Sequence, residues 1–562
     1  MFKKILYYQK TIGLAVFLSV VFLCLDYLII YFSPFIQNIF PLLFISCLIV
    51  AIFALSLARQ ENLAAHLFVL TLSLTVFFSF LSIVVNILME PFFDWNSARL
   101  AWTFSIKYGH QVFYGLSKGP ILARMYGPLM PLSYWPCTWM KTPTLAICLG
   151  SLLSVLFIFV PSISFFVIEA KKESFSKSAF FCYFSLFCLF SFSLYSLSRS
   201  IFMIHADAPS IGLAALACLF LYGDREELRP HYKILSAFFV ACSIWTKQIA
   251  VPLAIALPMY VWVKEGRRSA QSYFFQIILF LFSLLALFSY SFGFREMFEE
   301  MFLIPSRHPA RYSMGWGKGF FLIAWYFLKN TSLFVALILL TNIEPIKRLF
   351  KRAVSFNVFF KQNDWVLFFL VGVAMAPTAI LAMLKKGGDV NNFSFSIYFF
   401  VLAATICLVR FFLKSLKEVS LDRKKIIKFL FCILMFCLMS LSVGTFFSFF
   451  NRLILADRNP QEMAYVFSLQ NPEKIYFPDS ILSTCFSDKK VYHSLDGVYD
   501  RKNARIPIDP QHFKKYIPRK LEQIAIPKRY LYRHSYILEK FPEFHAQKGT
   551  KETAFWTVYE KK

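Results

Sequence analysis

Charged residues are scarce in this chain. Lys, Arg, Asp and Glu make up 16% of its 562 residues, whereas soluble globular domains average about 25%. Hydrophobic residues make up 58%. This shortage of charge excludes a soluble globular protein and indicates a multi-pass membrane protein.

Acidic residues are fewer than basic residues. The chain has 32 Asp and Glu against 59 Lys and Arg, which gives a formal net charge of +27. The basic residues cluster between apolar runs, where membrane topology explains them, so we expect no nucleic-acid partner. Most of the 12 Cys lie inside apolar runs and act as small hydrophobic side chains, so they do not reveal the redox compartment.

Repeats, low-complexity segments and targeting features are also lacking. The first apolar run, at 11–32, has no small-residue cleavage site after it, so we expect a retained membrane span. The lack of targeting features favours a bacterial inner membrane over the endoplasmic reticulum.

Apolar runs long enough to cross about 30 Å of hydrocarbon fill the first 450 residues. They predict about thirteen transmembrane helices, at 11–32, 40–57, 64–89, 142–168, 179–197, 208–222, 234–246, 250–263, 273–294, 320–340, 365–384, 393–412 and 427–450. The chain then becomes polar, with strand-like segments at 474–477 and 490–493. We expect an α-helical polytopic membrane domain (1–450) followed by a small soluble α/β domain (451–562).

Basic residues between the spans predict the orientation. With the N-terminus inside, most of the Lys and Arg fall in inner loops, as the positive-inside rule requires. An odd number of spans then places residues 89–131, 294–319, 385–392 and 451–562 on the outer side. We look for chemistry in these segments and around His205.

Residues 89–131 follow an apolar run but carry too many charges to lie in hydrocarbon. Glu90 and Asp94 are accompanied by four basic residues and by Trp side chains, such as Trp102, that suit the headgroup layer. The pattern predicts an amphipathic interfacial helix that begins at Asp94. A turn-rich return that contains Tyr126 should follow it.

Two polar segments interrupt later apolar runs. His205 and Asp207 lie at the start of the apolar run 208–222, where Asp207 is a candidate helix cap. Arg199 lies shortly before them. A capped span with an interfacial Arg is the simple alternative. Lys247, followed by Gln248, lies between two short runs and is a candidate for holding a lipid phosphate. Snorkelling to the interface is the alternative for this lysine.

The segment 385–392 places two lysines on the outer side. Two adjacent glycines let backbone amides approach an anion, and Lys386, Asn391 and Asn392 can bind sugar or phosphate. A plain tight turn is the alternative.

Residues 294–319 are expected to form a mobile outer loop. Its arginines, Arg307 and Arg311, are candidates for substrate contact. The glycine-rich run at 315–319 is not a dinucleotide fingerprint, because no strand precedes it and a span follows.

Together these pieces resemble the GT-C superfamily of integral-membrane glycosyltransferases, which use polyprenyl-phosphate-linked sugars. The resemblance covers 89–392 and rests on the acid in FFDWNSARLAW, YGPL at 126–129, HADAP at 205–209, WTKQ at 245–248, and KGG with the following NN. The polar outer tail is similar too. The family often has two adjacent acids, whereas Trp95 follows Asp94 here and Glu90 lies four residues earlier.

The resemblance implies inverting transfer of a sugar from a polyprenyl-phosphate-linked donor to a hydroxyl of a lipid, glycan or protein acceptor. It implies Asp94 as general base, with Glu90 as a second acid. It implies donor-phosphate binding by Lys247, Arg199 and Lys386, and substrate binding by Tyr126, His205, Asp207, Gln248, Asn391, Asn392, Arg307 and Arg311. A helix N-cap is the alternative for Asp94. No cofactor is certain, and a divalent metal is left open.

Other functions compete with this one. A flippase or transporter of lipid-linked glycans would also place ionisable groups near spans, but the hydropathy shows no inverted repeat and the charges cluster in outer loops. A non-catalytic scaffold is a second alternative, and a glycan polymerase or ligase would share the same outer face. The sequence does not encode the sugar or the acceptor.

Overall fold

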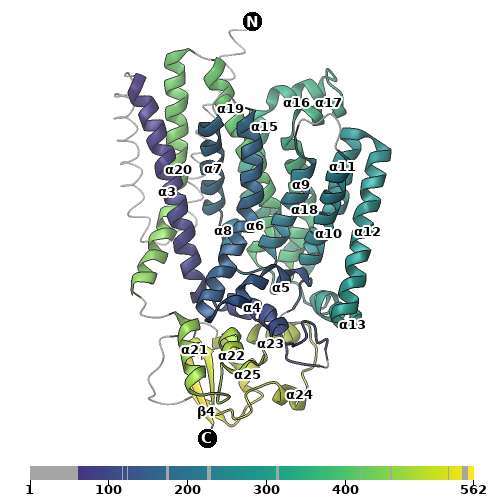
Figure 1. The fold of residues 1–562 in the computed structure, drawn as a ribbon, viewed down its shortest axis with the longest axis vertical. Coiled ribbons are helices and arrows are strands. Elements are labelled where there is room, and N and C mark those ends of the chain that lie inside the picture. The colour runs from purple at the N-terminus through teal and green to yellow at the C-terminus, as the bar shows by residue number, and fades with distance from the viewer. Residues whose placement is uncertain are drawn as a thin grey trace.

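The computed structural model describes residues 61–562 except 117, 123, 173–175, 224–228, 312–314, 419, 456–458, 529–530, 547–554 and 562. The predicted spans at 11–32 and 40–57 lie outside these residues. Long helices stand side by side, and the C-terminal domain lies under one end of them (Figure 1).

The regular elements of the membrane domain, within its described residues, are all helices, and the η elements are short 3₁₀ or π helices. Its elements are α3 (Glu61–Met89), η1 (Glu90–Phe92), α4 (Asp94–Lys107), α5 (Leu129–Ser133), η2 (Trp135–Trp139), α6 (Pro143–Lys171), α7 (Ser176–Ser193), α8 (Tyr195–Phe202), α9 (Asp207–Leu221), α10 (Pro230–Thr246), η3 (Gln248–Ala250), α11 (Leu253–Glu265), α12 (Arg267–Phe292), α13 (Phe294–Phe298), η4 (Glu299–Leu303), α14 (Ile304–Ser306), α15 (Gly315–Thr341), α16 (Ile343–Phe350), α17 (Phe356–Gln362), α18 (Trp365–Leu384), η5 (Val390–Phe393), α19 (Ser394–Glu418) and α20 (Leu421–Leu455).

Six described helices are long and apolar enough to cross a membrane, or up to eight if each bent pair counts as one span. One bent pair is α7 and α8, which meet at 102° where a single span was expected. The spans expected at 208–222, 234–246 and 250–263 are α9, α10 and α11, which have only 15, 17 and 13 residues. The described residues therefore confirm a polytopic helical fold, while the count of thirteen stays a prediction.

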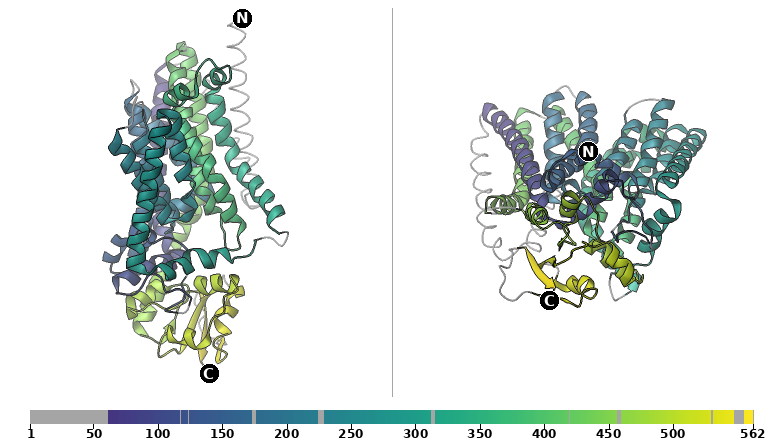
Figure 2. Two further views of the ribbon diagram at one scale, coloured as in Figure 1. Left: turned by 90° about the vertical axis from the view of Figure 1, so that its right-hand side faces the viewer. Right: turned by 60° about the horizontal axis from the view of Figure 1, so that its bottom comes forward.

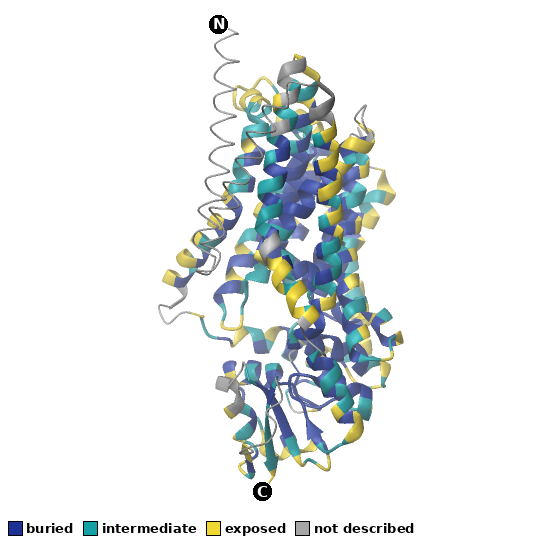
Figure 3. Cartoon of the chain, turned by 90° about the vertical axis from the view of Figure 1, so that its left-hand side faces the viewer, coloured by how far each residue is buried: buried dark blue, intermediate teal, exposed yellow. Residues whose placement is uncertain are grey.

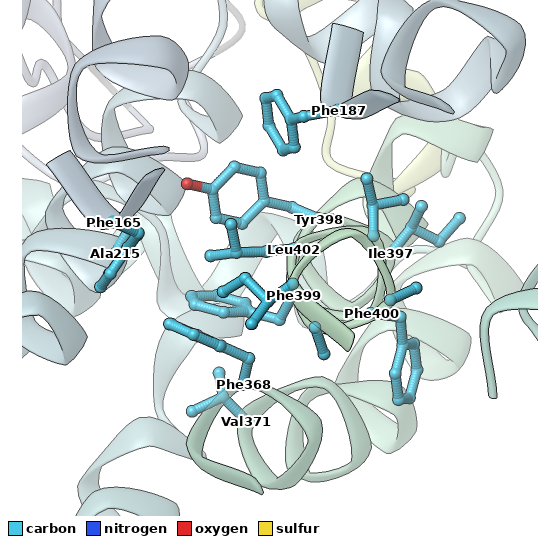
Figure 4. Packing of buried hydrophobic residues seen from close by; sticks show 14 of the residues in the cluster. Phe165, Phe187, Ala215, Phe368, Val371, Ile397, Tyr398, Phe399, Phe400 and Leu402 are labelled. Atoms are coloured by element: carbon cyan, nitrogen blue, oxygen red, sulfur yellow. The ribbon is translucent and has the colours of Figure 1, made fainter. Parts of the chain in front are cut away.

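Helix α19 forms the centre of the membrane domain. In its apolar window 83% of the residues are buried, as expected for a helix that is hydrophobic on all sides. Figure 4 shows Tyr398 and Phe399 of α19 among side chains of the neighbouring helices, including Phe187 and Phe368. The hydroxyls of Tyr398 and Ser162 lie 2.8 Å apart, so this buried polar group has a partner.

The C-terminal domain is a small α/β unit, as expected. Its elements are α21 (Pro460–Gln470), β1 (Ile475–Tyr476), α22 (Ile481–Asp488), α23 (Leu495–Asn503), α24 (Pro510–Lys515), β2 (Gln523–Pro527), α25 (Leu531–Leu538), β3 (Phe544–Ala546) and β4 (Trp556–Lys561). The strands follow the order β1-β2-β4-β3, with β1 parallel to β2 and the other pairs antiparallel.

The prediction of one of the two strands is wrong. The segment 474–477 contains β1, but 490–493 forms no strand. The backbone of this segment forms hydrogen bonds to residues outside the sheet. The amide of His493 donates to the carbonyl of Tyr516 (3.3 Å), and that of Ser494 donates to the carbonyl of Ile121 (2.8 Å). An alternating pattern predicts an extended backbone but not the partner that completes it.

The C-terminal domain covers α4. The amide of Leu482 donates to Ser97 Oγ (3.0 Å), and the amide of Ile121 donates to His493 Nδ1 (2.8 Å). Figure 2 shows the two domains in contact from two further directions, and Figure 3 shows buried residues both inside the bundle and near the junction. Helix α4 begins at Asp94 as expected, but Trp102 is only 1% exposed. Its expected place in the headgroup layer is therefore wrong.

Candidate active site

The first turn of α9 places a buried carboxylate among three polar partners. Asp207 is 1% exposed, and its carboxylate contacts Lys247 Nζ, Asn391 Nδ2 (2.6 Å) and His205 Nδ1 (2.5 Å). The cap position is taken by Ala206, without a side-chain hydrogen bond. Asp207 is therefore not a helix cap, because its side chain turns to neighbouring elements instead.

Lys247 lies where α10 ends. Its extended backbone (φ −147°, ψ 122°) stops the helix, and its ammonium reaches Asp207 and donates to Asn392 Oδ1 (3.0 Å). The residue is 4% exposed. Lys247 does not snorkel to the interface, since its charge is held inside the protein by a carboxylate and an amide.

Tyr126 joins this cluster through His205. Its hydroxyl lies 2.9 Å from His205 Nε2, and the two rings are 4.8 Å apart. Burial is the main cause that lowers the pKa of His205 to about 4, and Arg99 and Lys247 add to it against the opposing effect of Asp207. The imidazole is thus neutral at pH 7. Its Nδ1–H donates to Asp207, and its Nε2 accepts the hydroxyl proton of Tyr126.

A close backbone contact positions Tyr126. The amide of Gly127 donates to the carbonyl of Thr246 (3.2 Å), next to Lys247. A Cβ at Gly127 would lie 1.6 Å from the carbonyl oxygen of Trp245. Only glycine permits the turn at 126–129 to lie this close to the end of α10.

Arg99 of α4 lies on the other side of Tyr126 and was missed by the sequence analysis. Its guanidinium carbon is 4.9 Å from the centre of the Tyr126 ring, and the side chain is 5% exposed. Its Nε and Nη1 atoms have no hydrogen-bond partner among the residues that the structure describes. Lys247 Nζ lies 5.6 Å from the same ring, so two cations adjoin one aromatic side chain.

The C-terminal domain also acts on this site. Burial lowers the pKa of Arg99, but Tyr126 and the carboxylates of Asp496 and Asp500 on α23 outweigh that effect and keep the pKa above its ordinary value. Both carboxylates come from a domain that follows the membrane domain in the chain. No pattern near Arg99 could have indicated them.

Arg199 lies at the edge of the cluster. Its Nη1 is 3.0 Å from Asp389 Oδ2 and donates to the hydroxyl of Tyr195 (2.8 Å). Asp389 caps η5, the short helix that carries Asn391 and Asn392. Arg199 is therefore linked to the cluster through η5.

Lys386 is not part of the cluster as far as the hydrogen bonds of the described residues show. Its side chain is exposed, while its carbonyl lies 3.1 Å from His308 Nδ1 and its amide donates to the carbonyl of Pro309 (2.8 Å). The segment 385–392 is thus tied to the segment that follows α14, rather than forming an isolated tight turn.

The remaining predicted contacts are mainly between protein segments. Gln248 Nε2 donates to the carbonyl of Met125 (3.1 Å), Arg311 Nη1 donates to that of Gly388 (2.9 Å), and Arg307 is exposed. The loop expected at 294–319 is mostly helical, since α13, η4, α14 and the start of α15 lie within it. The expectation of a loop is therefore wrong for most of this segment.

Of the two predicted acids, Asp94 begins α4 and Glu90 begins η1, the short helix before it. Asp94 is buried as the first residue of the helix, and Phe93 takes the cap position, so the N-cap alternative is wrong. Glu90 Oε2 accepts from Asn96 Nδ2 (2.5 Å), and Asn96 Oδ1 accepts from the amide of Ile204 (2.8 Å). Asn96 thereby ties α4 to the linker that precedes His205, and Glu90 holds the Asn96 side chain in place.

A resident metal does not fit the described residues. No group of three or more His, Cys, Asp or Glu among them is arranged to hold an ion. Two apolar crevices of about 340 and 240 Å³ adjoin α6 and α9, but their linings include no residue of the Asp207 cluster.

Solved structures have a similar overall fold. ArnT from Cupriavidus metallidurans, in the apo state and bound to undecaprenyl phosphate, superposes with a TM-score of 0.50 and 11% identity, over 87% of this chain and 97% of that chain. The chain has the GT-C fold. The oligosaccharyltransferase of Archaeoglobus fulgidus, tethered with an acceptor peptide, gives a TM-score of 0.44 and 10% identity, over 85% of this chain and 72% of that chain. No family model and no curated protein sequence matches the chain.

Proposed function

We propose that the chain is a membrane glycosyltransferase that moves a sugar from a polyprenyl-phosphate-linked donor to an acceptor hydroxyl. The observation that carries the proposal is the buried polar cluster of Asp207, Lys247, His205 and Asn391, set where α9 begins and α10 ends in a GT-C fold. Buried ionisable groups gathered outside the long spans mark function more often than packing. The ArnT structure with undecaprenyl phosphate supports a lipid phosphate as donor group.

In the proposed reaction Asp94 takes the proton of the acceptor hydroxyl. The hydroxyl oxygen forms a bond to the anomeric carbon while the bond from that carbon to the phosphate oxygen breaks, and polyprenyl phosphate leaves with the bonding electrons. A single displacement inverts the anomeric configuration. Cations in the site stabilise the leaving phosphate, and Tyr126, Asn391 and Asn392 contact the sugar.

The site and the C-terminal domain lie on the outer face of the membrane in this proposal. The basic helices α16 and α17 lie at the opposite end of the bundle (Figure 1). The positive-inside rule favours that end as the inner one.

The test is transfer of labelled sugar from a panel of polyprenyl-phosphate donors in membranes that contain wild type or Asp94→Asn. Removing a general base should lower the rate about 100-fold or more at equal protein abundance. Asp509→Asn is the matched control, because Asp509 caps α24 on the exposed side of the C-terminal domain and Asn caps equally well.

Two results would contradict the proposal in different ways. If the wild type consumes no donor of the panel, the glycosyltransferase assignment is wrong. If Asp94→Asn and the wild type transfer sugar at the same rate, the enzyme class stands and Asp94 is not the base.

A further inference from the structure

Arg99 has hydrogen-bonding capacity that the protein does not use. A guanidinium carries five N–H donors and stays charged at any physiological pH. Arg99 is 5% exposed, yet Nε and Nη1 lack partners within the described part of the chain. Unsatisfied donors on a buried charge are unfavourable, so such a group in a native site calls for a ligand.

The other cations near the cluster are already engaged or exposed. Lys247 is bound to Asp207 and Asn392, Arg199 is paired with Asp389, and the side chain of Lys386 is exposed. A phosphate placed on Lys247 would have to compete with a buried carboxylate. Arg99 interacts with Tyr126 and lies in the field of Asp496 and Asp500, but it is the buried cation of this group whose Nε and Nη1 donors have no hydrogen-bond partner within the described residues.

The surroundings hold the Arg99 side chain in place. Its guanidinium adjoins the rings of Tyr126 (4.9 Å) and Trp95 (5.7 Å). Tyr126 in turn is fixed by His205 and by the turn at Gly127. A cation that stacks on aromatic rings keeps its N–H edge available for an anion.

We propose that Arg99 is the residue that binds the phosphate group of the polyprenyl-phosphate ligand. The inference rests on the proposed function and assigns a residue within that site. It replaces Lys247, Arg199 and Lys386 as the main phosphate ligand and leaves Lys247 the role of neutralising Asp207. Arginine suits this task because its planar fork matches phosphate oxygens.

Equilibrium binding to the purified full chain in nanodiscs tests the assignment. The probes are a labelled polyprenyl phosphate, the corresponding polyprenol and inorganic phosphate, and the variants are Arg99→Gln and Arg99→Lys. Loss of a charge-assisted contact should weaken polyprenyl-phosphate binding about 30-fold in Arg99→Gln and less in Arg99→Lys. Polyprenol binding should not change. Arg295→Gln, at an exposed arginine away from the cluster, is the control.

Each alternative outcome has its own meaning. If Arg99→Gln binds polyprenyl phosphate within threefold of the wild type, or if Arg199→Gln causes the larger loss, the assignment of Arg99 is overturned. If the wild type binds polyprenyl phosphate no better than polyprenol, the proposed function fails as well. Competition by inorganic phosphate in the wild type but not in Arg99→Lys would support recognition of the phosphate group itself. If Arg99→Gln does not fold, as a melting curve would reveal, Arg99→Lys carries the test, and wild-type affinity in that variant overturns the assignment.

Discussion

Asp207 and Lys247 form a buried ion pair in which each charge stabilises the other. Their side chains are 1% and 5% exposed. Removal of one partner from such a pair leaves the other charge uncompensated, which costs far more than the pair itself contributes. The pair therefore restricts which substitutions the site tolerates.

We expect Lys247→Met to destabilise the protein by about 3–5 kcal/mol. The double variant Asp207→Asn/Lys247→Met should recover part of this loss, because no buried charge then remains unpaired. Thermal unfolding of the purified proteins in one detergent measures how far each of the two variants differs from the wild type. A single variant that melts with the wild type would show that His205 and Asn391 suffice to hold the carboxylate.

Glu300 is a buried acid on η4, outside the Asp207 cluster. Burial is the main cause that raises its pKa to about 7, although Arg124 and the amide of Tyr114 oppose the shift. The carboxyl accepts that amide at 3.0 Å. Between pH 4.5 and 7 the folded state thus holds a proton that the unfolded state has lost, so stability falls as the pH rises through this window.

Glu300→Gln should therefore melt at a higher temperature than the wild type at pH 8 and at the same temperature at pH 5. The amide imitates the protonated acid and cannot ionise. Melting curves at the two pH values measure the effect, and Glu418→Gln, at an exposed carboxyl group, is the control. A gain of equal size at both pH values would contradict the ionisation argument.

At the scale of elements, the contact between α23 and residues 121–122 holds the C-terminal domain to the membrane domain. A Cβ at Gly497 would lie 2.6 Å from the carbonyl carbon of Leu122 and 2.8 Å from the carbonyl oxygen of Ile121. Arg501 of the same helix donates to the carbonyl of Leu116 (2.7 Å). Because backbone lies on both sides of this contact, it cannot adjust by a change of rotamer.

Gly497→Ala should push α23 away from residues 121–122 and weaken the domain junction. Limited proteolysis should then release the C-terminal domain faster than in the wild type. Gly317→Ala is a matched control, since Gly317 also lies in a helix and has no atom within 4 Å of an added Cβ. Equal cleavage rates for both variants would show that the junction tolerates a methyl group.

Several elements of the site follow from local sequence. The start of α4 at Asp94, the opening of α9 at Asp207 and the end of α10 at Lys247 were predicted because charges next to apolar runs indicate helix ends. These ends all lie at one end of the bundle, which is why Asp207, Lys247, Asn391 and His205 meet.

Other features depend on contacts between distant segments. The 102° bend between α7 and α8 carries no Pro or Gly at Leu194, so no usual kink signal was present. Arg99 was not predicted as a site residue, because Asp496 and Asp500, which act on it, are about 400 residues later in the chain. Burial by a separate domain leaves no trace in the local pattern.

For the whole molecule, orientation in the membrane decides on which side the site works. The proposed topology predicts that a membrane-impermeant maleimide labels Lys520→Cys from the outer side of intact cells. Lys351→Cys, at the opposite end, should react only after permeabilisation. Both lysines are exposed. The reverse labelling pattern would place the Asp207 cluster on the inner side.

The C-terminal domain, which packs over α4, is synthesised long after α4. Ser97 and Leu482, which bond across the domain junction, are 385 residues apart. At about 5–20 residues per second, a ribosome takes roughly 20–80 s to add that length of chain. For that time α4 is present without the domain that buries it. Its Trp and Arg side chains suit the lipid headgroup layer. We therefore expect the newly synthesised α4 to lie on the membrane surface until the C-terminal domain has been made and packs against it.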